Sequence, residues 1–148
     1  LEIYAESITL NPFTRLLKND GTNVSLNSIC ENPNQMFLLI SDKTCNSCIY
    51  DCLEDMNSFI KDIDPNNIIV LGLYDNKRNF FQLSRKYPFQ FYLLEQTSLL
   101  SEIEHKSQNP LFFTIDYQYN IKHAFSPIST YRSLTEGYLS TKMKLSYK

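Results

Sequence analysis

The chain has no tryptophan, no long basic stretch and no apolar run of membrane-spanning length. Lysine and arginine number 14 against 16 acidic residues, and this net charge of −2 gives no indication of a nucleic-acid partner. The apolar runs are far shorter than the roughly 20 residues that cross a bilayer, so no membrane span is predicted. A content of 43% hydrophobic and 20% charged residues is typical of a globular protein and argues against disorder.

Cysteine is also scarce, and four cysteines in 148 residues are too few for a small disulfide-stabilised scaffold. Three of them lie close together, at Cys45, Cys48 and Cys52, whereas Cys30 stands alone. This clustering indicates local chemistry rather than a covalent framework. The sequence leaves open whether Cys30 and Cys52 pair with each other or stay free.

The length fits one domain, which we expect to cover residues 1–148, with residues 1–12 as a flexible or accessory N-terminal segment. The chain begins with leucine rather than methionine, and no signal segment is visible in it. A removed signal segment and a shortened start would leave the same beginning.

Residues 36–56 are the most informative part of the sequence. The apolar run 36–40 predicts a buried strand, and after a polar bend Cys45-Asn46-Ser47-Cys48 opens a helical pattern that ends near Asp64-Pro65. A helix brings residues three apart onto one face, close enough for a disulfide, and its N-terminus stabilises the thiolate of the first cysteine. The pattern therefore predicts dithiol redox chemistry, in which Cys45 attacks a disulfide and Cys48 resolves the mixed disulfide.

The remaining patterns predict alternating strands and helices. The Asn19–Thr22 turn precedes an alternating segment at Val24 and Leu26, which indicates a hairpin or an edge strand. Further strands are predicted over 68–73, 89–94, 110–116 and 121–125, and further helices over 77–87, 99–105 and 129–144. This order predicts an α/β fold with a mixed central sheet and helices on both faces.

These elements resemble the thioredoxin superfamily, and within it the TlpA/ResA-type extracytoplasmic thiol–disulfide oxidoreductases. The first match is the strand followed by Cys45-Asn46-Ser47-Cys48 on a helix. The second is Asn109-Pro110 directly before a strand, where the family has its active-site proline in cis. The third is residues 20–26, Asp-Gly-Thr-Asn-Val-Ser-Leu, which are similar to the N-terminal hairpin of that subgroup. The long interval between Cys45 and Pro110 leaves room for the extra helix and strand of the TlpA-like branch.

The resemblance implies a three-layer thioredoxin-like fold with an N-terminal β-hairpin, a location in the bacterial periplasm or anchored to the cell envelope, and a monomer. It implies a protein disulfide as substrate, an upstream dithiol protein as redox partner, and no bound cofactor or metal. Asn109 and Pro110, with Thr44, would bind an extended substrate segment beside Cys45. Asp51, three residues beyond Cys48, falls at the position of that branch's acid–base residue.

The sequence also departs from the family pattern. Thr44 replaces the tryptophan that usually precedes the first cysteine, and Leu39 stands where thioredoxins bury a strand carboxylate. A thioredoxin-fold binding domain with little turnover therefore stays open as an alternative. The direction of electron flow stays open too, because the Asn-Ser dipeptide does not fix a reduction potential.

A metallochaperone is another alternative, since Cys45, Cys48 and Cys52 together would supply three sulfurs for Cu(I) or Zn. The competing interpretation of Cys52 is a small buried apolar residue. A peroxiredoxin is disfavoured, because Leu38 stands where the proline of the Pro-x-x-x-Thr/Ser-x-x-Cys motif is required. The two histidines, His105 and His123, show no pattern that assigns them a metal.

Overall fold

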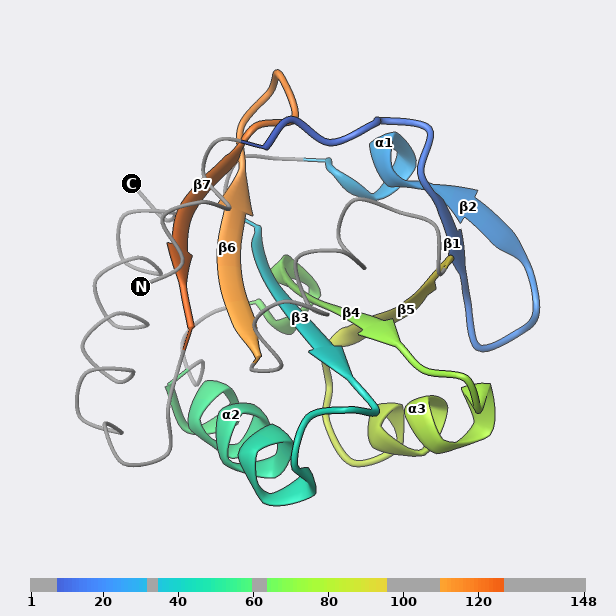
Figure 1. Ribbon diagram of the computed structural model, residues 1–148, viewed down its shortest axis with the longest axis vertical. Coiled ribbons are helices and arrows are strands. Elements are labelled where there is room, and N and C mark those ends of the chain that lie inside the picture. The colour runs from blue at the N-terminus through green and yellow to red at the C-terminus, as the bar shows by residue number, and fades with distance from the viewer. Residues whose placement is uncertain (1–7, 32–34, 60–63, 96–109, 127–148) are drawn as a thin grey trace.

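The computed structural model describes residues 8–31, 35–59, 64–95 and 110–126, and these form one mixed sheet with helices on both of its faces (Figure 1). The strands lie in the order β2-β1-β5-β4-β3-β6-β7. Their bounds are β1 Arg15–Leu17, β2 Asn23–Ser25, β3 Met36–Ser41, β4 Ile68–Leu73, β5 Gln90–Leu94, β6 Leu111–Ile115 and β7 Ile121–Phe125. The helices are α1 Leu26–Ile29, α2 Asn46–Phe59 and α3 Lys77–Ser84, with a 3₁₀ turn at Pro65–Asn67.

The centre of the sheet consists of the parallel strands β3, β4 and β5. Both β3 and β4 are buried along their whole length, which explains their continuous apolar sequences. Within β3, side chains alternate between two cores: Leu38 and Ile40 belong to one cluster, and Phe37 and Leu39 to the other. The antiparallel pairs β1–β2 and β6–β7 extend the sheet on its two sides.

Helices α2 and α3 cover one face of the sheet, and α1 lies on the other (Figure 1). The predicted apolar stripe of α2 is confirmed at four buried residues: Ile49, Cys52, Leu53 and Met56. Helix α3 contributes the fully buried ring of Phe80, which contacts the rings of Tyr74, Phe81 and Phe91. These rings belong to the same core cluster as the buried residues of α2.

Most of the predicted elements that lie within the described residues are confirmed, with small shifts at their ends. Strand β4 has its predicted bounds, β3 extends one residue further to Ser41, and α3 ends at Ser84 rather than at residue 87. The hairpin β1–β2 forms around the predicted turn. The alternating segment predicted at Val24 and Leu26 reaches beyond the strand, because β2 ends at Ser25 and α1 begins at Leu26. The predicted helices 99–105 and 129–144 lie outside the described residues.

Part of the predicted N-terminal segment is described, and it lies against the turn between β6 and β7. The backbone N–H of Leu10 donates to the carbonyl of Tyr119 at 2.7 Å, and that of Ile121 donates to the carbonyl of Ile8 at 3.0 Å. Leu10 itself is buried. None of the helices formed by the described residues combines the length and the apolar character needed to cross a membrane.

Candidate functional site

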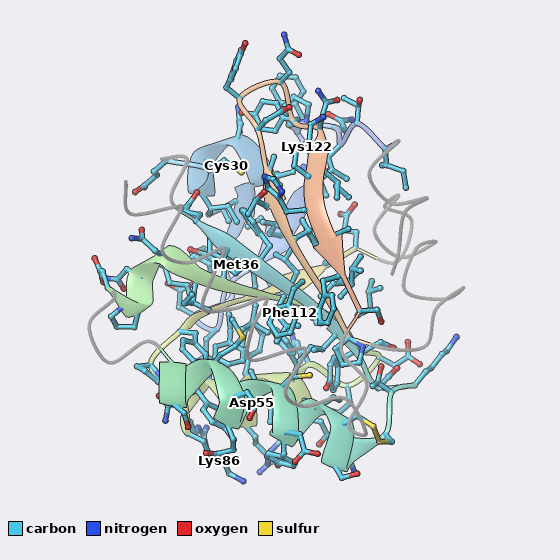
Figure 2. All side chains as sticks on the ribbon, turned by 90° about the vertical axis from the view of Figure 1, so that its left-hand side faces the viewer. Cys30, Met36, Asp55, Lys86, Phe112 and Lys122 are labelled. Carbon is cyan, nitrogen blue, oxygen red and sulfur yellow. A yellow bond between two sulfur atoms is a disulfide. The ribbon has the colours of Figure 1, made fainter. Side chains whose placement is uncertain are left out.

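The candidate site is the pair Cys45 and Cys48, which the structure joins in a disulfide with their Cα atoms 5.3 Å apart. The bond lies at the start of α2, just after the carboxyl end of β3, and is visible as the yellow bond in Figure 2. Cys45 is exposed and Cys48 is half-buried. An incoming sulfur therefore reaches Cys45 more readily than Cys48.

The sulfur of Cys45 occupies the N-cap position of α2. The backbone N–H of Cys48 donates to Cys45 Sγ at 3.1 Å, and the carbonyl of Cys45 accepts the first helical hydrogen bond from Ile49. Ser47 Oγ lies 3.4 Å from the same sulfur, and the hydroxyl must be the donor because a disulfide sulfur carries no proton. After reduction these two donors and the helix dipole would favour the Cys45 thiolate.

The loop between β3 and α2 is tied to the neighbouring loop between β4 and α3. Asp42 donates its backbone N–H to the carbonyl of Leu73 at 3.2 Å, and its carboxylate Oδ2 accepts the backbone N–H of Asp75 at 3.0 Å. The backbone N–H of Thr44 donates to the carbonyl of Ser41 at 3.1 Å, which closes a tight turn before Cys45. Two parallel strands thus hold the start of α2 in place.

Pro110 lies at the same end of the sheet as the disulfide. It directly precedes β6, whose first residue, Leu111, pairs with Leu39 near the carboxyl end of β3. Pro110 is buried, and its carbonyl accepts a hydrogen bond from Ser126 Oγ at 3.0 Å. No motif in the sequence singles out Ser126. Asn109 lies outside the described residues, so the predicted cis bond and the substrate-binding role of Asn109 and Pro110 stay predictions.

The other predicted site residues have distinct surroundings. Thr44 is buried, with 4% of its surface exposed, and Asp51 is exposed on α2, one helical turn beyond Cys48. Leu39 is buried in the α1-side core, on the face of the sheet opposite α2. The roles of Thr44 in substrate binding and of Asp51 in proton transfer stay predictions.

A buried carboxyl on α2 was not anticipated. Asp55 is only 4% exposed and lies one turn beyond Cys52, on the buried side of the helix (Figure 2). In the sequence, helical spacing places Asp55 among the apolar residues of the buried stripe. Carboxylates usually lie on the solvent face of a helix, so this spacing is easily overlooked as a sign of burial.

Cys30 and Cys52 are both free thiols, and the sheet lies between them. Cys52 belongs to the core under α2, whereas Cys30 packs against the core on the α1 side. Burial raises the pKa of Cys30 to about 11. Burial, with the nearby Asp55 and Asp51 carboxylates, raises the pKa of Cys52 to about 12. The open question of their pairing is answered: they do not form a disulfide.

These surroundings agree with Cys52 as a small buried residue and give little support to a site of three sulfurs. A metal ligand has to be a thiolate, and burial holds Cys52 in its neutral form. Over the described ranges, no group of three or more histidine, cysteine or acidic side chains is placed to hold a metal ion.

We expect the Cys52 thiol to resist alkylation in the folded, reduced protein at pH 8, where Cys45 reacts. Peptide mapping after a short iodoacetamide pulse measures both sites, with unfolded protein as the control in which every cysteine reacts. Rapid labelling of native Cys52 would contradict its burial.

The raised pKa of Cys52 also makes the stability of the protein depend on pH. Because the pKa is raised from 9.0 to about 12 in the folded protein, the free energy of unfolding should fall as pH rises through that window. Cys52→Ala should remove that part of the fall.

Comparison with known proteins bears on the fold. No family model and no curated protein matches the chain. Bacterioferritin comigratory protein from Xanthomonas campestris, whose study concerns alkyl peroxide reduction, has a similar structure: the TM-score is 0.62 at 14% identity, covering 95% of this chain and 98% of that one. A protein from Chlorobium tepidum described as a thiol:disulfide interchange protein, DsbE, gives a TM-score of 0.59 at 11% identity, covering 92% and 98%. The fold is thioredoxin-like.

Other structures with this thioredoxin-like fold serve different chemistry. ScoI from Arabidopsis thaliana, solved with copper bound, gives a TM-score of 0.60 at 9% identity, covering 93% of this chain and 99% of that one. At such identities the likeness establishes the fold alone. The predicted three-layer α/β fold is confirmed, and the choice among redox enzyme, peroxidase and copper protein rests on the residues at the site.

Proposed function

We propose that the protein is a thiol–disulfide oxidoreductase that uses Cys45 and Cys48 as its redox pair. The observation that carries the proposal is the Cys45–Cys48 disulfide at the exposed start of α2, with the Cys45 sulfur accepting the N–H of Cys48. Support comes from the thioredoxin-like fold, in which Pro110 precedes β6 at the same end of the sheet as the pair. No organic cofactor or metal is required for the exchange.

In the reducing direction, the Cys45 thiolate attacks one sulfur of a protein disulfide. A bond forms between Cys45 and that sulfur, and the second substrate sulfur leaves as a thiolate that takes up a proton. Cys48 then loses its proton and attacks Cys45 Sγ, which forms the Cys45–Cys48 bond and releases the second substrate thiol. The substrate gains two electrons and the protein loses two, and an upstream dithiol protein restores the reduced pair.

The same atoms permit the reverse direction, in which the Cys45–Cys48 disulfide oxidises substrate thiols. We propose an extracytoplasmic location, because disulfide exchange enzymes of the TlpA/ResA type act there and disulfides persist in oxidising compartments. A monomer suffices for the chemistry, because both reacting cysteines belong to one chain. The substrate-binding surface would comprise Thr44, Asn109 and Pro110.

The direct test incubates the protein with a model protein disulfide and with dithiothreitol in molar excess over the protein, at a concentration that reduces the substrate only slowly by itself, and counts the substrate thiols released. We expect multiple turnovers per protein molecule. Stoichiometric binding of the substrate without release of thiols would favour the alternative, a thioredoxin-fold binding domain. Copper titration of the reduced protein tests the metallochaperone alternative. Tight copper binding that depends on Cys52 would support a metal site of three sulfurs.

Asp51 is proposed to take the proton of Cys48 in the resolving step, because it follows Cys48 by one helical turn and is open to solvent. We expect Asp51→Asn to slow release of the mixed disulfide by about a hundredfold near neutral pH, with partial recovery at alkaline pH. Quenched-flow trapping of the mixed disulfide measures this step. Glu54→Gln, an equal change of charge one turn further along α2, is the control, and equal rates in the two variants would remove Asp51 from the mechanism.

A further inference from the structure

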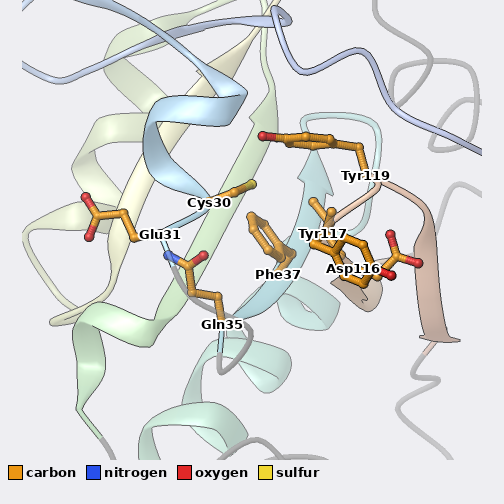
Figure 3. Close-up of a pocket in the computed structure, with 8 residues that line it drawn as sticks. Cys30, Glu31, Gln35, Phe37, Asp116, Tyr117 and Tyr119 are labelled. Atoms are coloured by element: carbon orange, nitrogen blue, oxygen red, sulfur yellow. The ribbon is translucent and has the colours of Figure 1, made fainter.

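A cavity of about 440 Å³ lies on the α1 side of the sheet, well away from the redox pair (Figure 3). It is bounded by residues at the end of α1, at the start of β3 and in the turn between β6 and β7. The disulfide follows the other end of β3, a strand of six residues, so about 20 Å of strand separates the two sites. The volume falls in the range of small-molecule sites.

The cavity contains an acceptor oxygen, Oε1 of Gln35, to which no described residue donates a hydrogen bond. Gln35 is 6% exposed, and its Nε2 donates to the carbonyl of Ile29 at 2.7 Å. Since a carbonyl only accepts, this bond fixes the orientation of the amide and turns Oε1 toward the cavity (Figure 3). No donor among the described residues bonds to Oε1. An acceptor on a mostly buried side chain, with no bond from a described donor, is open to a ligand that brings one.

Aromatic surface forms much of the remaining lining. Phe37 is buried at the base, and the Tyr119 ring extends across the opposite side (Figure 3). Tyr119 adopts a φ of +64°, a region that bulky residues rarely occupy, and hydrogen bonds to Asp116 and Leu10 hold it there. The turn thus keeps a large ring over the cavity at a position whose left-handed backbone conformation favours glycine or asparagine.

The charges around the cavity have one dominant sign. The described residues that line it include Glu31 and Asp116 and no lysine or arginine. Hydrogen bonds lower the pKa of Asp116, and the one from the backbone N–H of Asn120 has the largest effect, so this carboxylate stays ionised at neutral pH. Both carboxylates lie at the rim and point outward (Figure 3). The charge of the nearby Lys122 offsets part of the charge of Asp116. The rim therefore attracts a cation without contacting it directly.

We propose that this cavity is a binding site for a small aromatic amine in its protonated form. The ring would pack between Phe37 and Tyr119, and the ammonium group would donate to Gln35 Oε1 within the field of Glu31 and Asp116. The site is independent of the proposed oxidoreductase activity, because it lies at the other end of β3 and uses none of the redox residues.

The test is an NMR titration of the oxidised protein with three probes of similar size. Tyramine carries an ammonium group, tyrosol carries a neutral hydroxyl, and 4-hydroxyphenylacetate carries a carboxylate. We expect tyramine to give saturable shifts at the amides of Cys30, Gln35 and Tyr119, and to bind about tenfold more tightly than tyrosol. The carboxylate probe should give no saturable shift. Absence of saturation with tyramine, or equal binding of all three probes, would overturn the proposal.

Two variants locate the recognition. Gln35→Met keeps the length of the side chain and removes the acceptor, and it should weaken tyramine binding severalfold. Glu31→Gln changes only an exposed side chain and should weaken tyramine severalfold with the fold intact. Glu95→Gln, an equal change of charge at the redox end of the sheet, should have no effect. Native-like tyramine binding by both cavity variants would refute the assignment.

Discussion

Replacing Cys45 with serine is expected to lower disulfide exchange by about a thousandfold or more, because the attacking sulfur is lost. Serine is a good N-cap residue, so α2 should still form and the fold should survive. The measurement is the initial rate of thiol release from a protein disulfide, compared with the native protein. Cys52→Ala is the matched control on the same helix and should retain activity, since Cys52 is buried away from the exchange.

Cys48→Ser should behave differently from Cys45→Ser. Cys45 can still attack, but no second thiol displaces the substrate, so a covalent Cys45–substrate disulfide should accumulate. Non-reducing electrophoresis and mass spectrometry detect this species. Trapping through Cys48 in the Cys45→Ser protein, or substantial turnover by Cys45→Ser, would contradict the assignment of roles that follows from the exposure of Cys45.

The second large effect concerns stability, at Gly72 in β4. A Cβ at this position would lie within 2.7 Å of three ring carbons of Phe80, which is fully buried. The ring cannot move aside freely, because it packs against Tyr74, Phe81 and Phe91. We therefore expect Gly72→Ala to destabilise the protein by about 1–3 kcal/mol, despite its favourable effect on the entropy of the unfolded chain. Urea denaturation measures the change.

A double-mutant cycle tests the cause of that loss. Phe80→Leu removes the ring atoms that meet the new Cβ, so Gly72→Ala should cost markedly less in that background, with a coupling free energy of about 0.5–3 kcal/mol. Gly21→Ala is the control. Its cost comes from a φ of +87° with nothing within 4 Å, so it should be the same in both backgrounds. Equal costs of Gly72→Ala in both backgrounds would show that Phe80 is not the obstacle.

The central strands could be predicted because their sequences record their burial. The run 68–73 is apolar on every residue that carries a side chain, which is the pattern of a strand covered on both faces, and β4 has those bounds. The start of α2 could be predicted as well, because apolar residues recur at helical spacing directly after the Cys-x-x-Cys pair begins. These two features sufficed for the α/β fold class and for the pairing of Cys45 with Cys48.

Features that depend on long-range packing could not be predicted. Val24 and Leu26 alternate as a strand would, but the chain turns into the four-residue helix α1 at Leu26. Phe13 is 71% exposed although it is a large apolar residue, because apolar character alone does not fix burial. The cavity beside Gln35 is formed by segments far apart in the sequence, so no local sequence pattern predicts it.

The most direct test of the central claim is the redox equilibrium of the Cys45–Cys48 pair. The protein is equilibrated in dithiol–disulfide buffers, its thiols are trapped, and each cysteine is mapped by mass spectrometry. We expect one two-electron transition confined to Cys45 and Cys48, with a midpoint between about −100 and −350 mV, while Cys30 and Cys52 stay as thiols throughout. If no Cys45–Cys48 disulfide forms anywhere in that range, the protein is not a thiol–disulfide oxidoreductase.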